Sequence, residues 1–254
     1  MELYYLIIMF IFGTVFGSFY NVVGDRLPDG KSIVKPGSHC PKCGHHLKPL
    51  ELIPVLSYLF QRGKCKNCKC HIPVIHPLFE LSSGVLFALT YKIFNGFNIE
   101  FFISITFISA LLIIIVSDIN YYIIPDEILI IALVVMAILV VVSKGFTGLL
   151  SCLLNGLIAF VIMLLIKLMG DYLFKKESMG GGDIKLLFLF GFSLGWEMAL
   201  LTIFLGSIIG LPISLIILYK KNTNIIPFGP FLSIGAMMIL LSGFDFNRLL
   251  DLIS

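Results

Sequence analysis

The sequence predicts an all-α integral membrane protein with about eight transmembrane helices and a small cytoplasmic zinc-knuckle loop domain between helices 1 and 2. Of the 254 residues, 58% are hydrophobic and only 13% are charged, a composition too apolar for an ordinary soluble domain. Apolar runs of about 20 residues recur along the chain, and each can cross a hydrocarbon core of roughly 30 Å as a helix. One polar stretch interrupts them. This pattern excludes a secreted enzyme and a disordered tail.

Eight apolar runs mark the expected spans. The first run is too long for a cleavable signal and lacks its basic start, so we expect it to be retained as a span. The run at 184–195 is short, which leaves seven spans open on length alone. We expect a first transmembrane helix at 1–23, a cytoplasmic loop domain at 24–76 and a multi-pass domain at 77–254. The runs cover residues 3–23, 77–94, 101–117, 128–142, 146–169, 184–195, 198–219 and 228–244.

Lysine and arginine are distributed unevenly between alternate loops. With eight spans and the 24–76 segment in the cytoplasm, fifteen of the 18 basic residues lie on the cytoplasmic side. The other side receives Lys92, Lys144 and Arg248. The positive-inside rule therefore predicts a cell (inner) membrane protein with both termini outside and the loop domain inside. Seven spans would move Lys220 and Lys221 outside, so the charge pattern favours eight.

The loop domain contains two C-x2-C pairs, Cys40 with Cys43 and Cys65 with Cys68, separated by 21 residues. Four thiolates in this pattern can hold one Zn²⁺ in a tetrahedral site and stabilise a loop that has little hydrophobic core. Two disulfides are the alternative, which a reducing cytoplasm disfavours. We expect structural zinc, and Cys152 is expected to be a packing residue within a span. Other nearby side chains that could replace a ligand are Cys70, His39, His45, His46 and His71.

Two aspartates are expected at the same membrane interface. The span ending at Asp118 runs toward the cytoplasm, and the span beginning at Asp183 starts there. Two carboxyl groups in a partly desolvated site share a proton, so one can activate water while the other protonates a peptide carbonyl. Each aspartate could instead be only a helix cap or turn residue. The pairing on one face, beside Gly180, Gly181 and Gly182, favours catalysis, because glycines let an extended substrate approach the backbone.

Glu80 lies early in a span on the same cytoplasmic side. It is expected either to contact the substrate or to be a satisfied interfacial carboxylate. The loop domain carries nine basic and three acidic residues. We therefore expect it to lie against anionic lipid headgroups of the bilayer.

With these features placed, the sequence resembles the type IV prepilin peptidases, which are bifunctional leader peptidases and N-methyltransferases of the membrane. The resemblance covers most of the chain and lies in an ordered set of motifs. These are Gly17-Ser-Phe-Tyr-Asn-Val-Val-Gly-Asp-Arg-Leu-Pro28, Cys40-Pro-Lys-Cys43, Leu52-Ile-Pro-Val-Leu-Ser-Tyr58, Arg62-Gly-Lys-Cys65 with Cys68, Asp118, Ile124-Pro-Asp126, Gly180-Gly-Gly-Asp183 with Ile184-Lys-Leu186, and Pro227-Phe-Gly-Pro-Phe-Leu232.

The resemblance implies that Asp118 and Asp183 are the catalytic pair of an aspartic endopeptidase. It implies that the substrates are prepilin or pseudopilin precursors, whose basic leader is removed after a glycine at the cytoplasmic face. It also implies methylation of the new N-terminus by S-adenosylmethionine, although no glycine-rich loop following a strand marks a site for this cofactor. No nucleic acid partner is expected. Acids near the interface are expected to attract the leader, namely Glu80, Asp126, Glu127, Asp171 and Glu177.

Two other classes of function compete with this interpretation. In a membrane carrier, Asp118 and Asp183 would bind protons or cations near the bilayer midplane, whereas here they are expected at span ends on one face. In a scaffold for an export machine, the cysteine loop would dock partners and the aspartates would only cap helices.

Overall fold

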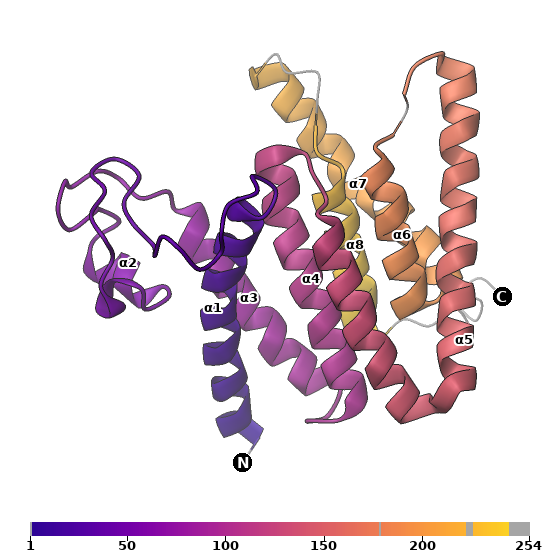
Figure 1. Ribbon diagram of the computed structural model, residues 1–254, viewed down its shortest axis with the longest axis horizontal. Helices are drawn as coiled ribbons and strands as arrows, with labels where there is room; N and C mark the ends of the chain where they lie inside the picture. Colours follow the sequence, from indigo (N-terminus) through magenta and orange to yellow (C-terminus); the bar gives the residue numbers. More distant parts are fainter. Residues whose placement is uncertain (1, 178, 222–225, 244–254) are drawn as a thin grey trace. The chain divides into compact units, whose positions relative to one another are not determined.

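The computed structural model describes residues 2–177, 179–221 and 226–243, and within them every regular element is helical (Figure 1). The chain forms two compact units, Met1–Gly96 and Phe97–Ser254. The first unit contains α1 (Glu2–Arg26), the short 3₁₀ helix η1 (Pro49–Glu51), α2 (Leu56–Phe60) and α3 (Ile75–Ile93). The second contains α4 (Ile99–Tyr121), α5 (Asp126–Phe174), α6 (Gly181–Leu194), α7 (Trp196–Lys221) and α8 (Gly229–Ser242).

The all-α fold class is confirmed, and each predicted run forms a helix within the described residues. Four helices, α1, α4, α5 and α7, are long and apolar enough to cross a membrane. The predicted run at 228–244 ends beyond the described part of the chain, where α8 stops at Ser242. Large apolar side chains are exposed along α1, α5 and α7. This is the surface that hydrocarbon would cover in a membrane protein.

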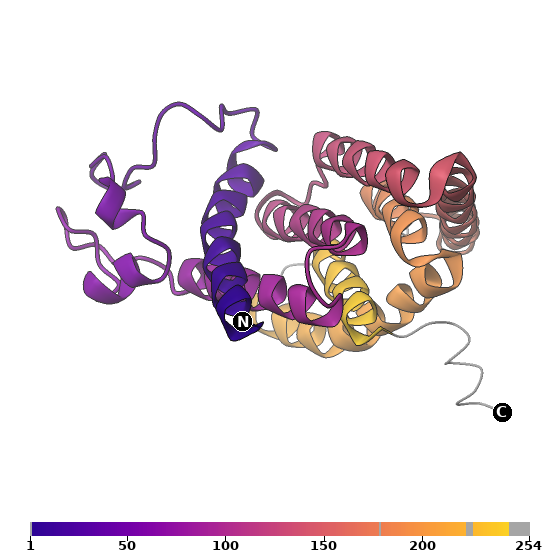
Figure 2. The same cartoon turned by 90° about the horizontal axis from the view of Figure 1, so that it is seen from below.

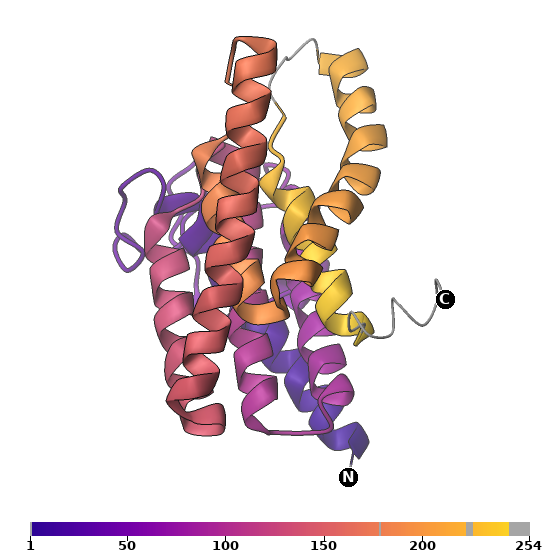
Figure 3. The same cartoon turned by 90° about the vertical axis from the view of Figure 1, so that its right-hand side faces the viewer.

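Helix α5 contains two of the predicted runs, and a break at Gly145 separates them. Gly145 has φ 68° and ψ −170°, values outside the helical region. Only glycine adopts this conformation without strain. The chain reverses direction at this turn (Figure 3), so α5 corresponds to two of the predicted spans.

In the first unit, α1 and α3 pack closely through small residues. A Cβ atom added to Gly13 would lie 2.7 Å from the backbone oxygen of Ser83 and 2.8 Å from Cα of Gly84. A Cβ on Gly17 would lie 2.7 Å from Cβ of Ser83. Glycines spaced four residues apart therefore form one face of α1, the arrangement that lets helices approach closely in membranes. The compact unit thus includes α3, whereas the sequence-based division began the multi-pass domain at residue 77.

In the second unit, α4 and α6 form much of the core. Phe107 of α4 and Phe190 of α6 are fully buried, with ring centroids 5.8 Å apart and edge-to-face geometry. Helix α4 also packs against α5 and α8 (Figure 2). Burial on several sides explains how a helix as short as α6 is stable. The C-terminal end of α4 and the N-terminal ends of α6 and α8 lie at the same end of this unit (Figure 1).

Candidate functional site

Asp118 lies one turn before the end of α4 and is only 6% exposed. The helix ends at Tyr122, which has a positive φ of 58° and donates its backbone N–H to the carbonyl oxygen of Asp118 at 3.0 Å. The hydroxyl of the preceding Ser117 donates to the carbonyl oxygen of Ile123 at 2.5 Å. Helix α5 then begins after Pro125, whose fixed φ suits a helix start. The turn that follows Asp118 is therefore held by its own backbone.

The carboxylate of Asp118 lies against the N-terminus of α8. A Cβ atom added to Gly229 would lie 2.6 Å from Oδ2 of Asp118, and the backbone N–H of Gly229 donates to this carboxylate. A helix N-terminus favours a nearby negative charge. In the sequence, Gly229 lies within the motif from Pro227 to Leu232 but is not marked as a site residue. A glycine next to a proline at the start of an apolar run was the available signal.

Asp183 is the third residue of α6, and the glycine run before it leads into that helix. A Cβ on Gly182 would lie 3.1 to 3.3 Å from the side chain of Ile124, and Cδ1 of the same Ile124 would lie 3.4 Å from a Cβ on Gly229. Ile124 therefore packs at the starts of both helices. Asp183 is also within range of a direct charge interaction with Asp118. The structure thus brings the two carboxyl groups to the same end of the second unit.

The glycine run leaves its backbone open. Gly180 and Gly181 are exposed, and a Cβ added to Gly181 would meet no atom of the described residues within 4 Å. The nearest atom to a Cβ on Gly180 would be Oδ2 of Asp183, at 3.5 Å. An extended peptide could therefore reach the backbone beside this carboxylate. Helix α6 is also held in place by an ion pair, since Nζ of Lys185 lies 2.7 and 2.8 Å from the two carboxylate oxygens of Asp126 at the start of α5.

Glu80 lies on α3 in the first unit, and its carboxylate accepts a hydrogen bond from the loop domain. Its Oε2 accepts the backbone N–H of Val55 at 2.8 Å. Val55 has φ 61°, which is rare for a β-branched residue. On either side of Val55, the backbone N–H of Leu56 donates to the carbonyl oxygen of Pro54 at 2.5 Å. The carboxylate of Glu80 therefore holds a strained turn in the loop domain.

The two cysteine pairs of the loop domain form two similar knuckles. In the first, the backbone N–H of Cys40 donates to the carbonyl oxygen of His45, and that of Gly44 donates back to Cys40, both at 2.9 Å. In the second, the backbone N–H of Cys65 donates to the carbonyl oxygen of Cys70 at 2.9 Å, and that of Lys69 donates to the carbonyl oxygen of Cys65 at 3.0 Å. The same hydrogen bonds thus recur 25 residues apart. The two knuckles are therefore two copies of the same small hairpin.

The four sulfur atoms of Cys40, Cys43, Cys65 and Cys68 lie within 4.8 Å of one another. Sγ of Cys40 is 3.8 Å from that of Cys68, and Sγ of Cys43 is 4.0 Å from that of Cys65. A tetrahedral zinc site with Zn–S bonds of about 2.3 Å requires sulfur separations of roughly 3.8 Å. The cluster therefore fits a tetrahedral metal ion.

Backbone amides prepare two of these thiols for deprotonation. The N–H groups of Cys43 and Lys42 lower the pKa of the Cys40 thiol to about 6. Those of Cys68 and Asn67 lower the pKa of Cys65. The thiolate is the form that binds metal, so the hairpin backbone favours the ligand state. The side-chain amide of Asn67 also donates to Sγ of Cys43 at 3.7 Å.

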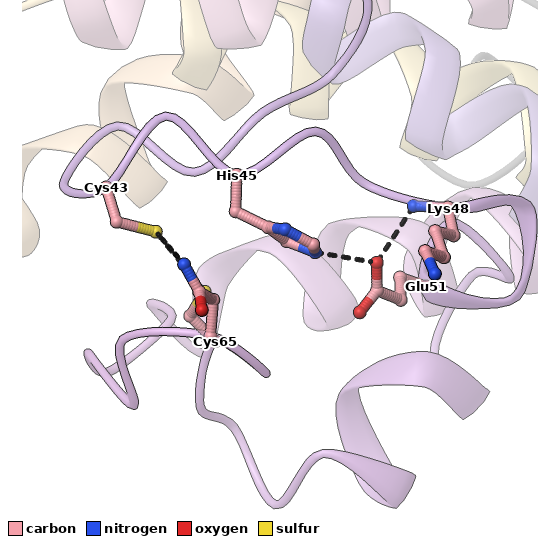
Figure 4. Close-up of polar contacts among 6 residues, drawn as sticks. Cys43, His45, Lys48, Glu51 and Cys65 are labelled. Atoms are coloured by element: carbon pink, nitrogen blue, oxygen red, sulfur yellow. Dashed lines mark hydrogen bonds and ion pairs between the residues drawn. The ribbon is translucent and has the colours of Figure 1, made fainter.

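The alternative ligands have different surroundings. Cys70 lies 3.5 Å from Cys40 by their sulfur atoms but is outside the group of four with mutually close sulfurs. His45, which occupies the equivalent position in the first knuckle, pairs with Oε2 of Glu51 at 3.1 Å (Figure 4). The ring of His39 faces that of His46, with centroids 6.1 Å apart. Cys152 lies in α5 and is partly buried.

Fold and sites together define a class of protein: a multi-pass helical membrane protein with a cluster of four thiols in a loop and two carboxyl groups within range of a charge interaction at one end of its second unit. Family models identify it further. Residues 11–94 match the bacterial peptidase A24 N-terminal domain, and residues 105–215 match the type IV leader peptidase family. The chain belongs to the type IV leader peptidase family and is a membrane peptidase.

Curated relatives agree with this assignment along almost the whole chain. A prepilin leader peptidase/N-methyltransferase of Bacillus subtilis is 37% identical over 244 residues, which are 94% of this chain and 94% of the relative. Proteins of the same name from Pseudomonas aeruginosa and Aeromonas hydrophila are 33% and 30% identical. Those matches cover 94% and 96% of this chain, and 90% and 93% of the relatives. No solved structure matches significantly.

Proposed function

We propose that this protein is an aspartic endopeptidase that removes the basic leader of type IV prepilin or pseudopilin precursors at the cytoplasmic face of the membrane. The observation that carries the proposal is the pairing of Asp118 and Asp183 beside an exposed glycine backbone. The names of the relatives supply the substrate class, because each is a prepilin leader peptidase/N-methyltransferase.

Two neighbouring carboxyl groups provide an acid and a base for peptide hydrolysis. One is ionised and takes a proton from water as the water oxygen bonds to the peptide carbonyl carbon. The other is protonated and gives its proton to the carbonyl oxygen. When the tetrahedral intermediate collapses, the C–N bond breaks and the leaving nitrogen receives a proton. The products are a carboxylate and an amine, so no covalent enzyme intermediate is required.

The position of Asp118 argues against a purely structural role. It lies near the C-terminus of α4, where the helix dipole disfavours negative charge. It is also buried, which costs free energy for a carboxylate. Asp183, by contrast, lies in the first turn of α6, where a carboxylate is favourable. The start of α8 and the backbone N–H of Gly229 offset part of this cost at Asp118. Asp118 and Asp183 are nevertheless within range of a mutual charge interaction, and two purely structural carboxylates would not require that proximity.

The acids proposed to attract the leader divide into groups. Asp126 is paired with Lys185, and Glu80 accepts a backbone N–H, so both charges are partly compensated. Glu127 and Glu177 are exposed. We infer that exposed acids of this kind make the larger contribution to attraction of the basic leader. The basic loop domain, in contrast, is proposed to contact anionic headgroups.

A second activity follows from the relatives' names, which include N-methyltransferase. S-adenosylmethionine, when bound, would supply the methyl group for the new N-terminal amine. Zinc bound by Cys40, Cys43, Cys65 and Cys68 would supply folding free energy to the loop domain. A site closed by four thiolates has no open position for a substrate, so we assign the metal a structural role.

Substitution of each aspartate by asparagine tests the peptidase proposal. Asp118→Asn and Asp183→Asn keep side-chain size but remove the carboxylate, and we expect each to lower cleavage about a thousandfold or more. Cleavage of a purified precursor by detergent-solubilised enzyme is measured by mass spectrometry. Glu100→Gln, which removes an exposed acid from the first turn of α4, is the matched control and should retain cleavage.

Membrane insertion of all three variants is checked by fractionation. If both aspartate variants insert and cleave at the rate of the unmodified protein, the peptidase proposal is wrong and a scaffold role gains support. If the aspartate variants lose proton- or cation-coupled transport but still cleave the precursor, a carrier function gains support.

A further inference from the structure

The loop domain exposes apolar side chains that its own fold leaves uncovered. Leu50 of η1 is 78% exposed and Phe60 at the end of α2 is 84% exposed. Every residue of α2 is at least partly exposed. Further exposed apolar side chains of this stretch, residues 50–60, are Leu52, Ile53, Leu56 and Leu59. An exposed apolar patch of this kind is typical of a surface that meets a membrane or a partner, and we call residues 50–60 the apolar segment.

A cavity of about 690 Å³ joins the apolar segment to the second cysteine knuckle, and Leu50 and Phe60 both line it. The acid in its lining, Glu51, is only 8% exposed. Its Oε2 accepts the backbone N–H of Lys48 and pairs with His45 (Figure 4). Four basic residues of the lining, which we call the basic rim, are Arg62, Lys64, Lys66 and Lys69. The cavity therefore combines exposed cations with apolar side chains, which suits an anion attached to hydrocarbon.

A hydrogen bond ties the apolar segment to the start of a membrane helix within the same unit. Oε2 of Glu80 accepts the backbone N–H of Val55 at 2.8 Å, and Val55 leads directly into α2. Glu80 lies in the second turn of α3, a predicted span whose first turns are expected at the cytoplasmic interface. Leu78 in the first turn is 54% exposed. The apolar segment is therefore held near the depth at which headgroups meet hydrocarbon.

We propose that the apolar segment docks into the anionic leaflet of the membrane, with Leu50 and Phe60 among the acyl chains and a lipid phosphate at the basic rim. The inference rests on the proposed function, in which the loop domain contacts anionic headgroups, and it names the face that makes this contact. Lysine and arginine can lay their apolar stems along Leu50 and Phe60 while their charged ends reach phosphates. Apolar burial and charge attraction together bind an interface more firmly than charge alone.

Two other occupants fit this face less well. The basic leader of a precursor would be repelled by the four cations of the basic rim. A second copy of the chain would bring the same four cations together across a symmetric contact. An anionic lipid surface matches both the charge and the apolar side chains, and the bond to Glu80 holds the segment beside a predicted span.

Tryptophan fluorescence of the full-length chain in vesicles tests the docking. Trp196 is replaced by phenylalanine, and a single tryptophan is introduced by Phe60→Trp or Leu50→Trp. Each protein is reconstituted in phosphatidylcholine vesicles with or without phosphatidylglycerol, and with plain or brominated acyl chains, because bromine quenches tryptophans that reach the acyl region. We expect bromine to remove roughly half of the emission at both positions when phosphatidylglycerol is present, and little without it. His46→Trp, at an exposed position outside the cavity lining, is the control and should not be quenched.

Charge reversal tests the basic rim. In the Phe60→Trp protein, Lys64→Glu combined with Lys66→Glu should lower the quenching about twofold or more. Lys35→Glu combined with Lys42→Glu is an equal change at exposed lysines outside the cavity lining, and it should leave the quenching unchanged. An equal loss in both double variants would mean that the loop domain is attracted as a whole. The docking face would then be wrong, although the headgroup contact of the proposed function would stand.

Precursor cleavage by the same vesicles separates this proposal from the peptidase proposal. Protein that cleaves the leader while the tryptophans at positions 50 and 60 escape quenching overturns the docking and leaves the peptidase intact. Equal quenching with and without phosphatidylglycerol also overturns it, because no anionic headgroup would be recognised. If the emission changes with the number of chains per vesicle but not with bromine, a second copy covers the face and the proposal is wrong.

Discussion

At the scale of single residues, the candidate peptidase site depends on what surrounds Asp118 as much as on the carboxylate itself. Gly229 leaves room for the carboxylate and donates its backbone N–H to it. Ile124 packs at the starts of both α6 and α8. A hydrogen-bonded carboxylate with little free space has few alternative positions. The position of Oδ2 is therefore sensitive to one added methyl group.

Gly229→Ala tests this sensitivity. The added Cβ would lie 2.6 Å from Oδ2 of Asp118, so the carboxylate must move. We expect the turnover number for leader cleavage to fall about a hundredfold, measured at saturating precursor, with the melting temperature changed by only a few degrees. Gly37→Ala is the control, because a Cβ there meets no atom within 4 Å. Turnover unchanged by Gly229→Ala would show that this contact does not position the carboxylate.

Some site residues could be predicted from the sequence and others could not, because only the first kind carries a distinctive chemical group or spacing. Asp118 and Asp183 could be found because charge is scarce in this chain, and the four cysteines because their spacing is regular. Gly229 and Ile124 carry no chemical group that marks them. Glu51 is one of three acids in a polar loop, and only tertiary folding leaves one of its oxygens buried without a partner among the described residues.

At the scale of elements, close helix contacts depend on small residues in register. The contact of α1 with α3 uses Gly13 and Gly17, and that of α6 with α5 uses Gly191, where a Cβ would lie 2.6 Å from the backbone oxygen of Asn155. In a membrane, association of helices relies on such packing because lipid is as apolar as the side chains. Hydropathy locates the helices but does not indicate which faces meet.

Gly13→Leu should disrupt the contact between α1 and α3. A Cβ at this position already overlaps the backbone of α3, so a larger side chain must separate the helices. We expect a loss of stability of about 3 kcal/mol, measured as a lower unfolding midpoint in detergent. Ile11→Leu, at an exposed position of the same helix, should change the midpoint little. An unchanged midpoint for Gly13→Leu would argue that the two helices do not pack through this face.

At the scale of the whole molecule, the chain divides into a unit that carries the cysteine loop and a unit that carries both aspartates. The loop domain contains no buried apolar cluster comparable to the α4 and α6 core among the described residues. Its two knuckles are joined through four close sulfurs. We therefore expect metal to control the folding of the loop but not that of the second unit.

Metal removal tests this division. Purified protein should contain about one zinc ion per chain by elemental analysis, and a strong chelator should release it. Limited proteolysis should then cut within residues 27–74, while the 97–174 region stays protected. Cys40→Ser combined with Cys65→Ser should behave like the chelated protein. Metal-free protein with a protected loop, or free thiols replaced by disulfides, would contradict the prediction.

The proposed sidedness can be tested by labelling in intact cells. Phe146, next to the Gly145 turn, is 79% exposed and is expected outside, whereas Lys176 is expected in the cytoplasm. A membrane-impermeant maleimide should label Phe146→Cys in intact cells and Lys176→Cys only after permeabilisation. Unmodified protein is the control for its six cysteines. The opposite pattern would reverse the orientation derived from lysine and arginine.

The sequence by itself determined the membrane class, the helical runs and the four-cysteine loop, and it singled out the two candidate aspartates. It could do so because each depends on local composition or spacing: an apolar run is a helix in lipid, and two pairs of cysteines, each pair three positions apart, suit one metal ion. Tertiary structure alone decided that Asp118 meets the start of α8, that Glu80 serves the loop and that Glu51 lines a cavity. These contacts join residues 25 to 111 positions apart or depend on a cavity wall built from several segments. No local pattern encodes them, because they depend on how helices and hairpins pack.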